Sequence, residues 1–296
     1  MRTNSRKWSA DKWFDIFNYL LLTGVLLIVL YPLYFIFIAS LSEPLQVSAG
    51  NVKLWPKNFT FEGYMTVFKE SSFLKGFRNS LFYAAFGTLI NLMVTLPAAY
   101  SLSRSDLKGR NIFTFIFVFT MFFSGGLIPL YIIVKDLGIL NTVWALVLPG
   151  ALSVWNLIIA RTFFQMTISK EILEAAKIDG ASNTRFFLTI VLPLSKALIA
   201  VMILFYGVGH WNTYFNALIF VRDRELFPLQ LVLREMLVLN TLETHIMDRQ
   251  LLEKRQSLAE SMKYSAIMIS SIPVLILYPF LQRYFVKGIM IGSLKG

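Results

Sequence analysis

The sequence predicts an all-α membrane protein with six transmembrane helices. Hydrophobic residues form 56% of the chain and charged residues only 15%, whereas soluble domains carry about 25% charged residues. The mean hydropathy is +0.62. Six windows contain no charged residue, and at ~1.5 Å per residue each is long enough for a helix to cross a hydrocarbon layer of ~30 Å. These windows are residues 16–42, 79–103, 111–134, 137–160, 197–221 and 264–282.

The spans are predicted to be helices rather than barrel strands. A barrel strand alternates apolar and polar residues over about 9 to 11 positions. Residues Val25 to Leu30, in contrast, are apolar without interruption. Proline removes a backbone hydrogen bond from a helix, and neighbouring helices in a membrane bundle can satisfy the freed carbonyl. We therefore expect kinked spans at Pro32, Pro97, Pro129, Pro149 and Pro273.

The first window could be mistaken for a secretory signal, because basic residues precede it. Its 27 uncharged residues, 16–42, exceed the roughly 7 to 15 of a signal's apolar region. No small-x-small cleavage site follows it before Glu43 and Pro44. We therefore keep this window as the first span.

The orientation of the spans is predicted from the basic residues that flank them. Four basic residues precede the first span, and Arg104, Lys108 and Arg110 occupy the short loop after the second. The short loop after the third span holds only Lys135. Both termini are therefore placed in the cytoplasm. This gives a cytoplasmic N-terminus over residues 1–15, a six-span domain over residues 16–286 and a cytoplasmic tail over residues 287–296.

The composition argues against several functional classes. The net charge of +11 comes from basic residues scattered among apolar spans, which fits membrane flanks and contact with lipid rather than a nucleic-acid surface. The chain has no cysteine, and its only histidines are His210 and His245, which makes thiol chemistry and the common metal sites poor candidates. We assign no catalytic residue and no metal ligand.

Two long connections lie on the extracellular side in this topology. Residues 43–78 contain Trp55, Pro56 and the run Phe59 to Tyr64, which predicts a packed loop with interfacial aromatic residues. Residues 222–263 contain apolar residues at helical spacing from Leu229 to Leu237, which predicts an amphipathic helix. Both connections are suited either to contact a partner or to lie against the bundle.

The third long connection, residues 161–196, is cytoplasmic in this topology. Ser169 is a helix cap, and Glu171 and Glu174 place negative charge near the positive end of the helix dipole. Gly180 provides a left-handed stop. Ala175 and Ala176 leave one face of this short helix almost bare, so another backbone can approach it closely. The pattern predicts a docking element.

The same stretch resembles the EAA loop of ATP-binding cassette (ABC) importer permeases. That motif is Glu-Ala-Ala, three residues, Gly, nine residues, Ile, one residue and Leu-Pro. The chain matches every specified position from Glu174 to Pro193, within a loop that we bound at residues 169–193. The loop also lies two spans before the C-terminus, as it does in the family.

Further segments resemble the carbohydrate-uptake branch of this family, which is related to the smaller membrane subunit of the maltose importer. These segments are Ser124 to Tyr131, Gly138 to Thr142 and Phe227 to Leu231. Within the branch, the resemblance is strongest to LplC-like and alginate-importer-like permeases for complex oligosaccharides. It covers nearly the whole chain and implies the type I importer permease fold.

The resemblance implies a heteromeric importer in the bacterial cytoplasmic membrane. Two homologous permease subunits form the pathway, two ATPase subunits bind ATP and Mg on the cytoplasmic side, and an extracellular solute-binding protein delivers an oligosaccharide. This chain then binds no cofactor and is not an enzyme, in keeping with the absence of a P-loop sequence. The residues implied in ATPase coupling, through a cytoplasmic coupling helix, are Glu174, Ala175, Ala176, Asp179 and Gly180.

The substrate path is predicted from polar and aromatic residues within the spans, because sugars are bound by stacking and amide hydrogen bonds. Asn212 and Asn216 are four residues apart, which places them on one face of a helix. Asparagine also joins membrane helices by hydrogen bonds of roughly 0.6 to 2 kcal/mol, so a structural role is an alternative. The candidates are Asn91, Trp155, Asn156, Trp211, Asn212, Tyr214 and Asn216.

Two other classes of transporter are alternatives. An ion-coupled secondary transporter usually has charged residues within its spans. The six windows contain none, which leaves His210 as the titratable candidate. A channel subunit is compatible with the composition, but it leaves the motif from Glu174 to Pro193 without a role.

Overall fold

The computed structural model describes residues 5–238 and 262–277, together with residues 279 and 282. All regular structure in these residues is helical, which confirms the predicted all-α class. The chain divides into two compact units, one from residues 1–70 and 236–270 and the other from residues 71–235 and 271–296. Each unit is described on its own.

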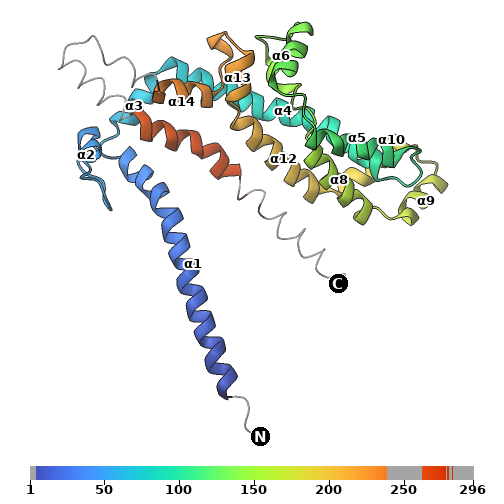
Figure 1. Cartoon of the computed structure of the whole chain (residues 1–296), viewed down its shortest axis with the longest axis horizontal. Coiled ribbons are helices and arrows are strands. Elements are labelled where there is room, and N and C mark those ends of the chain that lie inside the picture. Colours follow the sequence, from blue (N-terminus) through green and yellow to red (C-terminus); the bar gives the residue numbers. More distant parts are fainter. Residues whose placement is uncertain (1–4, 239–261, 278, 280–281, 283–296) are drawn as a thin grey trace. The chain divides into compact units, whose positions relative to one another are not determined.

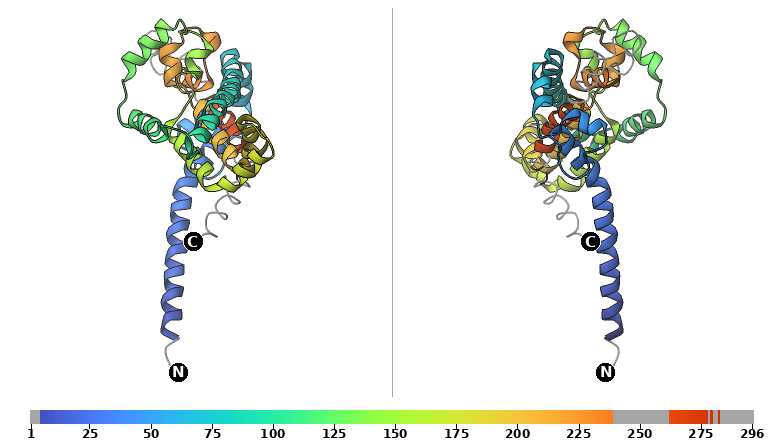
Figure 2. Two further views of the ribbon diagram at one scale, coloured as in Figure 1. Left: turned by 90° about the vertical axis from the view of Figure 1, so that its right-hand side faces the viewer. Right: turned by 90° about the vertical axis from the view of Figure 1, so that its left-hand side faces the viewer.

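The first unit is dominated by one long helix, α1 (Ser5–Ser40), which continues through Pro32 without a break (Figures 1 and 2). Only 6% of the most apolar 18-residue window of this helix is buried. Almost all side chains of that window are therefore available to lipid or to another protein. Two short helices follow, α2 (Pro44–Ser48) and α3 (Glu62–Lys69). Tyr264, in a helix over Met262–Leu277, packs edge to face on Phe35.

The loop that contains α2 folds back on the end of α1. The Tyr34 hydroxyl donates to the Leu54 carbonyl at 2.6 Å, and the Lys57 amide donates to the Ser42 hydroxyl at 3.1 Å. The packed loop predicted for this segment is thus confirmed. Its aromatic residues nevertheless point outward, and Trp55 is 75% exposed.

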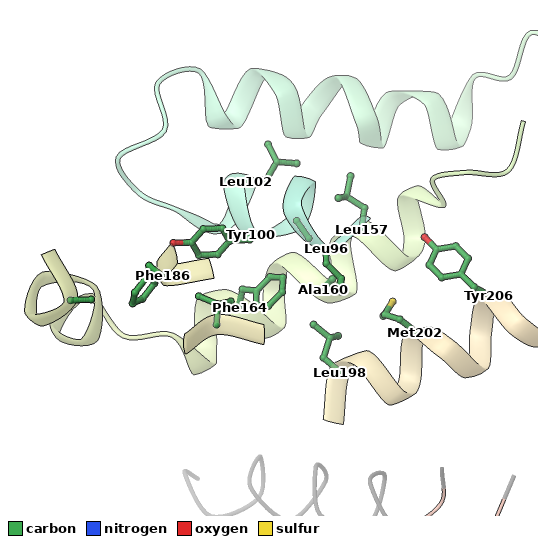
Figure 3. Packing of buried hydrophobic residues seen from close by; sticks show 13 residues of the cluster. Leu96, Tyr100, Leu102, Leu157, Ala160, Phe164, Phe186, Leu198, Met202 and Tyr206 are labelled. Atoms are coloured by element: carbon green, nitrogen blue, oxygen red, sulfur yellow. The ribbon is translucent and has the colours of Figure 1, made fainter. Parts of the chain in front are cut away.

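The second unit is built around α4 (Ser71–Ser103), which packs along α8 (Val154–Thr167) and α12 (Lys196–Trp211). Figure 3 shows the apolar core between these helices, formed by residues such as Leu96, Leu157 and Met202. The remaining helices are α5 (Arg110–Phe122), α6 (Leu127–Asp136), α7 (Val143–Val147), α9 (Lys170–Ile178), α10 (Asn183–Phe186), α11 (Leu192–Leu194), α13 (Phe215–Phe220) and the beginning of α14 (Leu229–Val238).

Among the described residues, two helices are long and apolar enough to span a membrane alone, Asp11–Ser40 and Ser71–Ser103. The number rises to four if each of two bent helix pairs is a single span. A continuous helix covers residues 79–103 and all of residues 16–42 except the last two, where α1 has ended. The sixth window, residues 264–282, lies partly outside the described residues.

The other three windows, residues 111–134, 137–160 and 197–221, are each divided between two helices. An extended segment with Gly125 and Gly126 separates α5 from α6, and the two helices differ in direction by 115° (Figure 2). Gly126 directly precedes α6 and has φ +83°, a backbone conformation that favours glycine. Pro149 lies in the break between α7 and α8, and residues 212–214 separate α12 from α13.

Two segments that carried the family resemblance have structural roles in the loops after α6 and α13. Asn141 adopts φ +58°, and its side-chain oxygen accepts hydrogen bonds from the amides of Arg222 and Asp223 at 2.9 and 2.8 Å. Asn79 of α4 donates to the Phe227 carbonyl at 3.1 Å. Side chains therefore satisfy backbone groups where the helical pattern stops.

A buried polar ladder joins α4 to α12. Asn91 and His210 form one rung at 2.6 Å, and Thr95 and Tyr206 form the next at 2.7 Å. Within each helix the two residues are four positions apart, so the rungs run between antiparallel helices. Both rungs also hold the chain just before α8, because Asn91 donates to the Gly150 carbonyl and the Ser153 amide donates to Tyr206.

The ladder brings the His210 ring directly over Gly87. A Cβ at position 87 would lie 2.4 Å from His210 Nε2. By contrast, a Cβ at Gly207 in α12 would meet Thr88 Oγ1 at 3.6 Å, an ordinary contact. Gly87 must therefore stay small, whereas Gly207 need not.

We predict that Gly87→Ala destabilises the protein by about 1–3 kcal/mol, the typical cost of overpacking a core. Gly207→Ala should be neutral or stabilise by up to about 1 kcal/mol through helix propensity. Thermal unfolding of both variants in detergent tests this difference. Equal midpoints for the two variants would contradict the close packing of His210 on Gly87.

Candidate functional site

The candidate site is the short helix α9 and the turn that follows it. α9 begins after Ser169, as predicted, and Glu171 lies in its first turn. The Ser169 hydroxyl makes no capping hydrogen bond to a helix amide, so this helix start relies on backbone geometry and on charge. Glu174 lies one turn further along and is exposed.

The end of α9 is a Schellman turn. The Gly180 amide donates to the Lys177 carbonyl at 3.0 Å, and the Ala181 amide donates to the Ala176 carbonyl at 2.9 Å. Gly180 has φ +76°, which confirms the predicted left-handed stop. Asp179 is the residue at which the helix ends.

The two faces of α9 differ sharply in burial. Ala176 is 5% exposed and packs with Leu173 in the apolar core of the unit. Glu174 and Ala175 are exposed, and Ile178 is 86% exposed. The expectation that Ala175 and Ala176 share one bare face was wrong, because one of them points inward. The outward face instead offers a carboxylate, a methyl group and an unpartnered isoleucine.

A polar cluster that the sequence reasoning did not identify lies beside α9. Arg104, directly after α4, makes a two-pronged hydrogen bond with Asp106, whose side chain also lies 4.0 Å from the Lys177 ammonium. The Arg104 hydrogen bond lowers the pKa of Asp106 to about 2. One available signal was that Asp106 is the single carboxylate in the basic loop between Arg104 and Arg110.

Asn91 lies inside the ladder between α4 and α12. Asn91 is fully buried, with its amide nitrogen on the Gly150 carbonyl and its oxygen on His210. Asn156 is also buried, at 6% exposed, while its neighbour Trp155 is 65% exposed. These three candidates therefore do not line one common surface.

The cluster predicted at the fifth span is divided by a helix break. Trp211 ends α12, is buried, and packs edge to face on Phe77. Asn212 caps α12, whereas Asn216 lies in α13. The argument that both asparagines share one helical face was therefore wrong, because no continuous helix joins them. Asn212 and Tyr214 are exposed at the break, and Asn216 is half-buried.

A cavity of about 430 Å³ lies between α4, α12 and the segment after Ser271. Trp211 is the one path candidate among its described lining residues, and the others include Leu81, Leu92, Ile203 and Leu277. Such a lining offers few partners for sugar hydroxyls. Among the described residues, no group of three or more His, Asp or Glu side chains is placed to hold a metal ion.

Comparison with known proteins finds relatives that match nearly the whole chain. It is 41% identical to the protein LplC of Bacillus subtilis (strain 168), over 97% of this chain and 96% of LplC. It is 37% identical to YtcP, the polygalacturonan/rhamnogalacturonan transport system permease protein of the same organism, over 97% and 99% of the two chains.

Among solved structures, the chain is similar to a bacterial ABC transporter involved in the import of the acidic polysaccharide alginate. The TM-score is 0.85 at 33% identity, and the match covers 96% of this chain and 100% of that chain. No family model matches the sequence.

Proposed function

The chain belongs to the permease subunits of ABC sugar importers, and on this premise we propose that it forms one half of an oligosaccharide pathway and couples to ATPases through α9. Subunits of this kind are not enzymes, and ATP is hydrolysed by their partners. The proposed assembly contains a second, homologous permease, two ATPase subunits and an extracellular solute-binding protein.

The observation that carries the coupling role is the exposed face of α9. A helix that is held by one buried residue, Ala176, while Ile178 stays 86% exposed, has the form of an element that another protein covers. Glu174 adds a charge that can pair with a basic residue of the ATPase. The Schellman turn at Gly180 ends this helix sharply, so the docking face is short and well defined.

The proposed topology retains six spans with both termini in the cytoplasm. The breaks after α5, α7 and α12 fit spans that are discontinuous, as irregular backbone within a membrane is tolerated where protein or a water-filled cavity surrounds it. The basic residues beside α9, including Arg104 and Arg110, support its placement on the cytoplasmic side.

An oligosaccharide is the proposed substrate, since two of the similar proteins are named for the transport of polysaccharides. The exposed residues at the break between α12 and α13 are the best sites in this chain for sugar contact. Asn212 offers amide hydrogen bonds, and Tyr214 offers a ring for stacking.

The alternative of an ion-coupled transporter loses support from the position of His210. This residue is bonded to Asn91 within the α4–α12 ladder, with the histidine 8% exposed. A side chain that holds two helices together is poorly suited to load and release an ion.

The proposed assembly is tested by purifying the tagged chain from its native host in mild detergent and identifying its companions by mass spectrometry. We expect a second permease and an ATPase. Recovery of the chain alone, even after crosslinking at position 174, would overturn the proposed function and return the ion-coupled alternative.

We predict that Glu174→Lys and Gly180→Pro leave the chain in the membrane but weaken ATPase association and abolish uptake. Proline cannot adopt the φ of +76° that position 180 requires. Gly138 provides a matched control, because it has φ +69° and closes the same type of turn after α6. Gly138→Pro should retain the ATPase, and normal uptake by both test variants would exclude the docking role.

We predict that Asn212→Leu alters sugar-stimulated ATP hydrolysis without dissociating the complex. Asn156→Leu serves as the comparison, since Asn156 is buried and its replacement should act through stability. Hydrolysis by the purified complexes, measured across sugar concentrations, separates the two effects. Unchanged stimulation and uptake would give Asn212 a structural role.

A further inference from the structure

We propose that Arg104 and Asp106 are positioning residues that clamp α9 to the end of α4, so that α4 passes movements of α9 along the unit. The transmission part of this proposal rests on the coupling role proposed for α9. The clamp itself is defined by the contacts of Arg104, Asp106, Lys177 and Asn183.

Almost every N–H group of the Arg104 guanidinium donates a hydrogen bond. Its Nε and Nη2 atoms donate to the two carboxylate oxygens of Asp106, and its Nη1 atom donates to the Tyr100 hydroxyl at 3.1 Å and to Asn183 Oδ1 at 2.8 Å. Four of its five N–H groups therefore have acceptors. The side chain is only 13% exposed, and its charge lies 5.8 Å from the centre of the Tyr100 ring. Because these acceptors have fixed positions, they hold the guanidinium in one orientation.

The contacts of the clamp fall on both sides of the turn after α9. Asn183 is the first residue of α10, just after the turn, and accepts from Arg104 directly. Lys177 is in the last turn of α9, just before the turn, and pairs with Asp106 at 4.0 Å. The hydrogen bond from Arg104 to Asn183 is therefore the main contact of the clamp, and the exposed pair of Lys177 with Asp106 adds a weaker contact on the other side of the turn.

Apolar packing alone secures this corner poorly. α9 buries Ala176 and α10 buries Phe186, and no other residue of these two helices is buried. An element that exposes most of its surface for a partner has little area left for a core. We infer that hydrogen bonds and ion pairs supply the lateral restraint that burial does not.

The clamp connects to α4, whose length and packing suit it to transmit movement. α4 has 33 residues and runs unbroken, a length of about 50 Å at ~1.5 Å per residue. Tyr100, which accepts from Arg104, is 7% exposed and packs on Phe164 and Phe187. A displacement of the clamp therefore acts on a residue that is fixed within the core.

The opposite end of α4 holds another segment just as firmly. Asn79 donates to the Glu225 carbonyl at 2.7 Å, Tyr83 donates to the Leu226 carbonyl at 2.8 Å, and Ser80 accepts from the Leu229 amide at 2.8 Å. One helix therefore joins α9 to residues 225–229. This gives the α9 corner a direct mechanical connection to the start of α14.

The clamp is stable to changes in pH over the physiological range. Arg104 lowers the pKa of Asp106 from 3.8 to about 2, so the contribution of this pair is complete above pH ~4 and is lost only as the pH falls through about 2. A change of transport activity between pH 5 and 8 therefore does not come from titration of Asp106.

The chain contains no cysteine, so spin labels attached to introduced cysteines before assembly mark only the chosen positions of this chain. Labels at Val94→Cys in α4 and Lys170→Cys in α9 report the position of α9 by pulsed electron paramagnetic resonance. We expect Arg104→Gln and Asp106→Asn to broaden this distance distribution. They should also reduce the stimulation of ATP hydrolysis by the binding protein roughly fivefold or more, within the usual range for coupling between sites.

Three controls separate positioning from general damage. The pair Val94→Cys and Phe205→Cys reports α4 against α12 and should not change. Arg104→Lys keeps the positive charge but loses the two-pronged hydrogen bond. It should therefore show the same broadened distances and reduced stimulation as Arg104→Gln. Lys75→Gln removes an exposed ion pair at the opposite end of α4, between side chains that are 53% and 66% exposed, and should leave the α9 distance unaffected.

Unchanged α9 distances in Arg104→Gln and Asp106→Asn would overturn the clamp. Broadened distances with full stimulation and uptake would overturn the transmission role while leaving the clamp in place. A wild-type chain that recovered no ATPase would refute the proposed function and the transmission role, and the distances would still decide whether Arg104 and Asp106 position α9.

Discussion

The fold depends on one requirement, that polar groups buried among apolar helices must find partners within the protein. The ladder of Asn91 with His210 and Thr95 with Tyr206 meets this requirement between α4 and α12. The same side chains satisfy backbone groups at Gly150 and Ser153, just before α8. Because these bonds have fixed directions, they set the register of three helices that apolar packing alone would allow to slide.

The chain uses different interactions at the two kinds of helix contact. Inside the core, the helices are joined by neutral hydrogen bonds, which avoid the cost of burying a charge. Beside α9, the loop after α4 is joined to α10 by the charged hydrogen bond from Arg104 to Asn183, and to α9 by the pairing of Asp106 with Lys177. α9 must present its surface to a partner, so it has little apolar area with which to pack. Charge-assisted bonds are strong enough to hold such an element without burying it.

Sequence reasoning succeeded where the determinants are local. α9 begins after Ser169 and ends in the turn at Gly180, and the long apolar runs of α1 and α4 predicted long helices there. The helix breaks inside the other apolar windows were not located, because hydropathy does not register helix breaks. Asn91 bonds to Gly150 and His210, 59 and 119 residues away, and Arg104 reaches Asn183, 79 residues away, so no local pattern contains these contacts. Both the ladder and the clamp therefore needed three-dimensional contacts.

The contact of His210 with Gly87 has a consequence for how such chains diverge. The ring occupies the space that a side chain at position 87 would fill. A larger residue at position 87 is compatible only with a smaller one at position 210. Loss of His210 would in turn leave the side-chain oxygen of Asn91 without its partner. Substitutions at these three positions are therefore coupled, whereas positions on the exposed faces of the same helices can change independently.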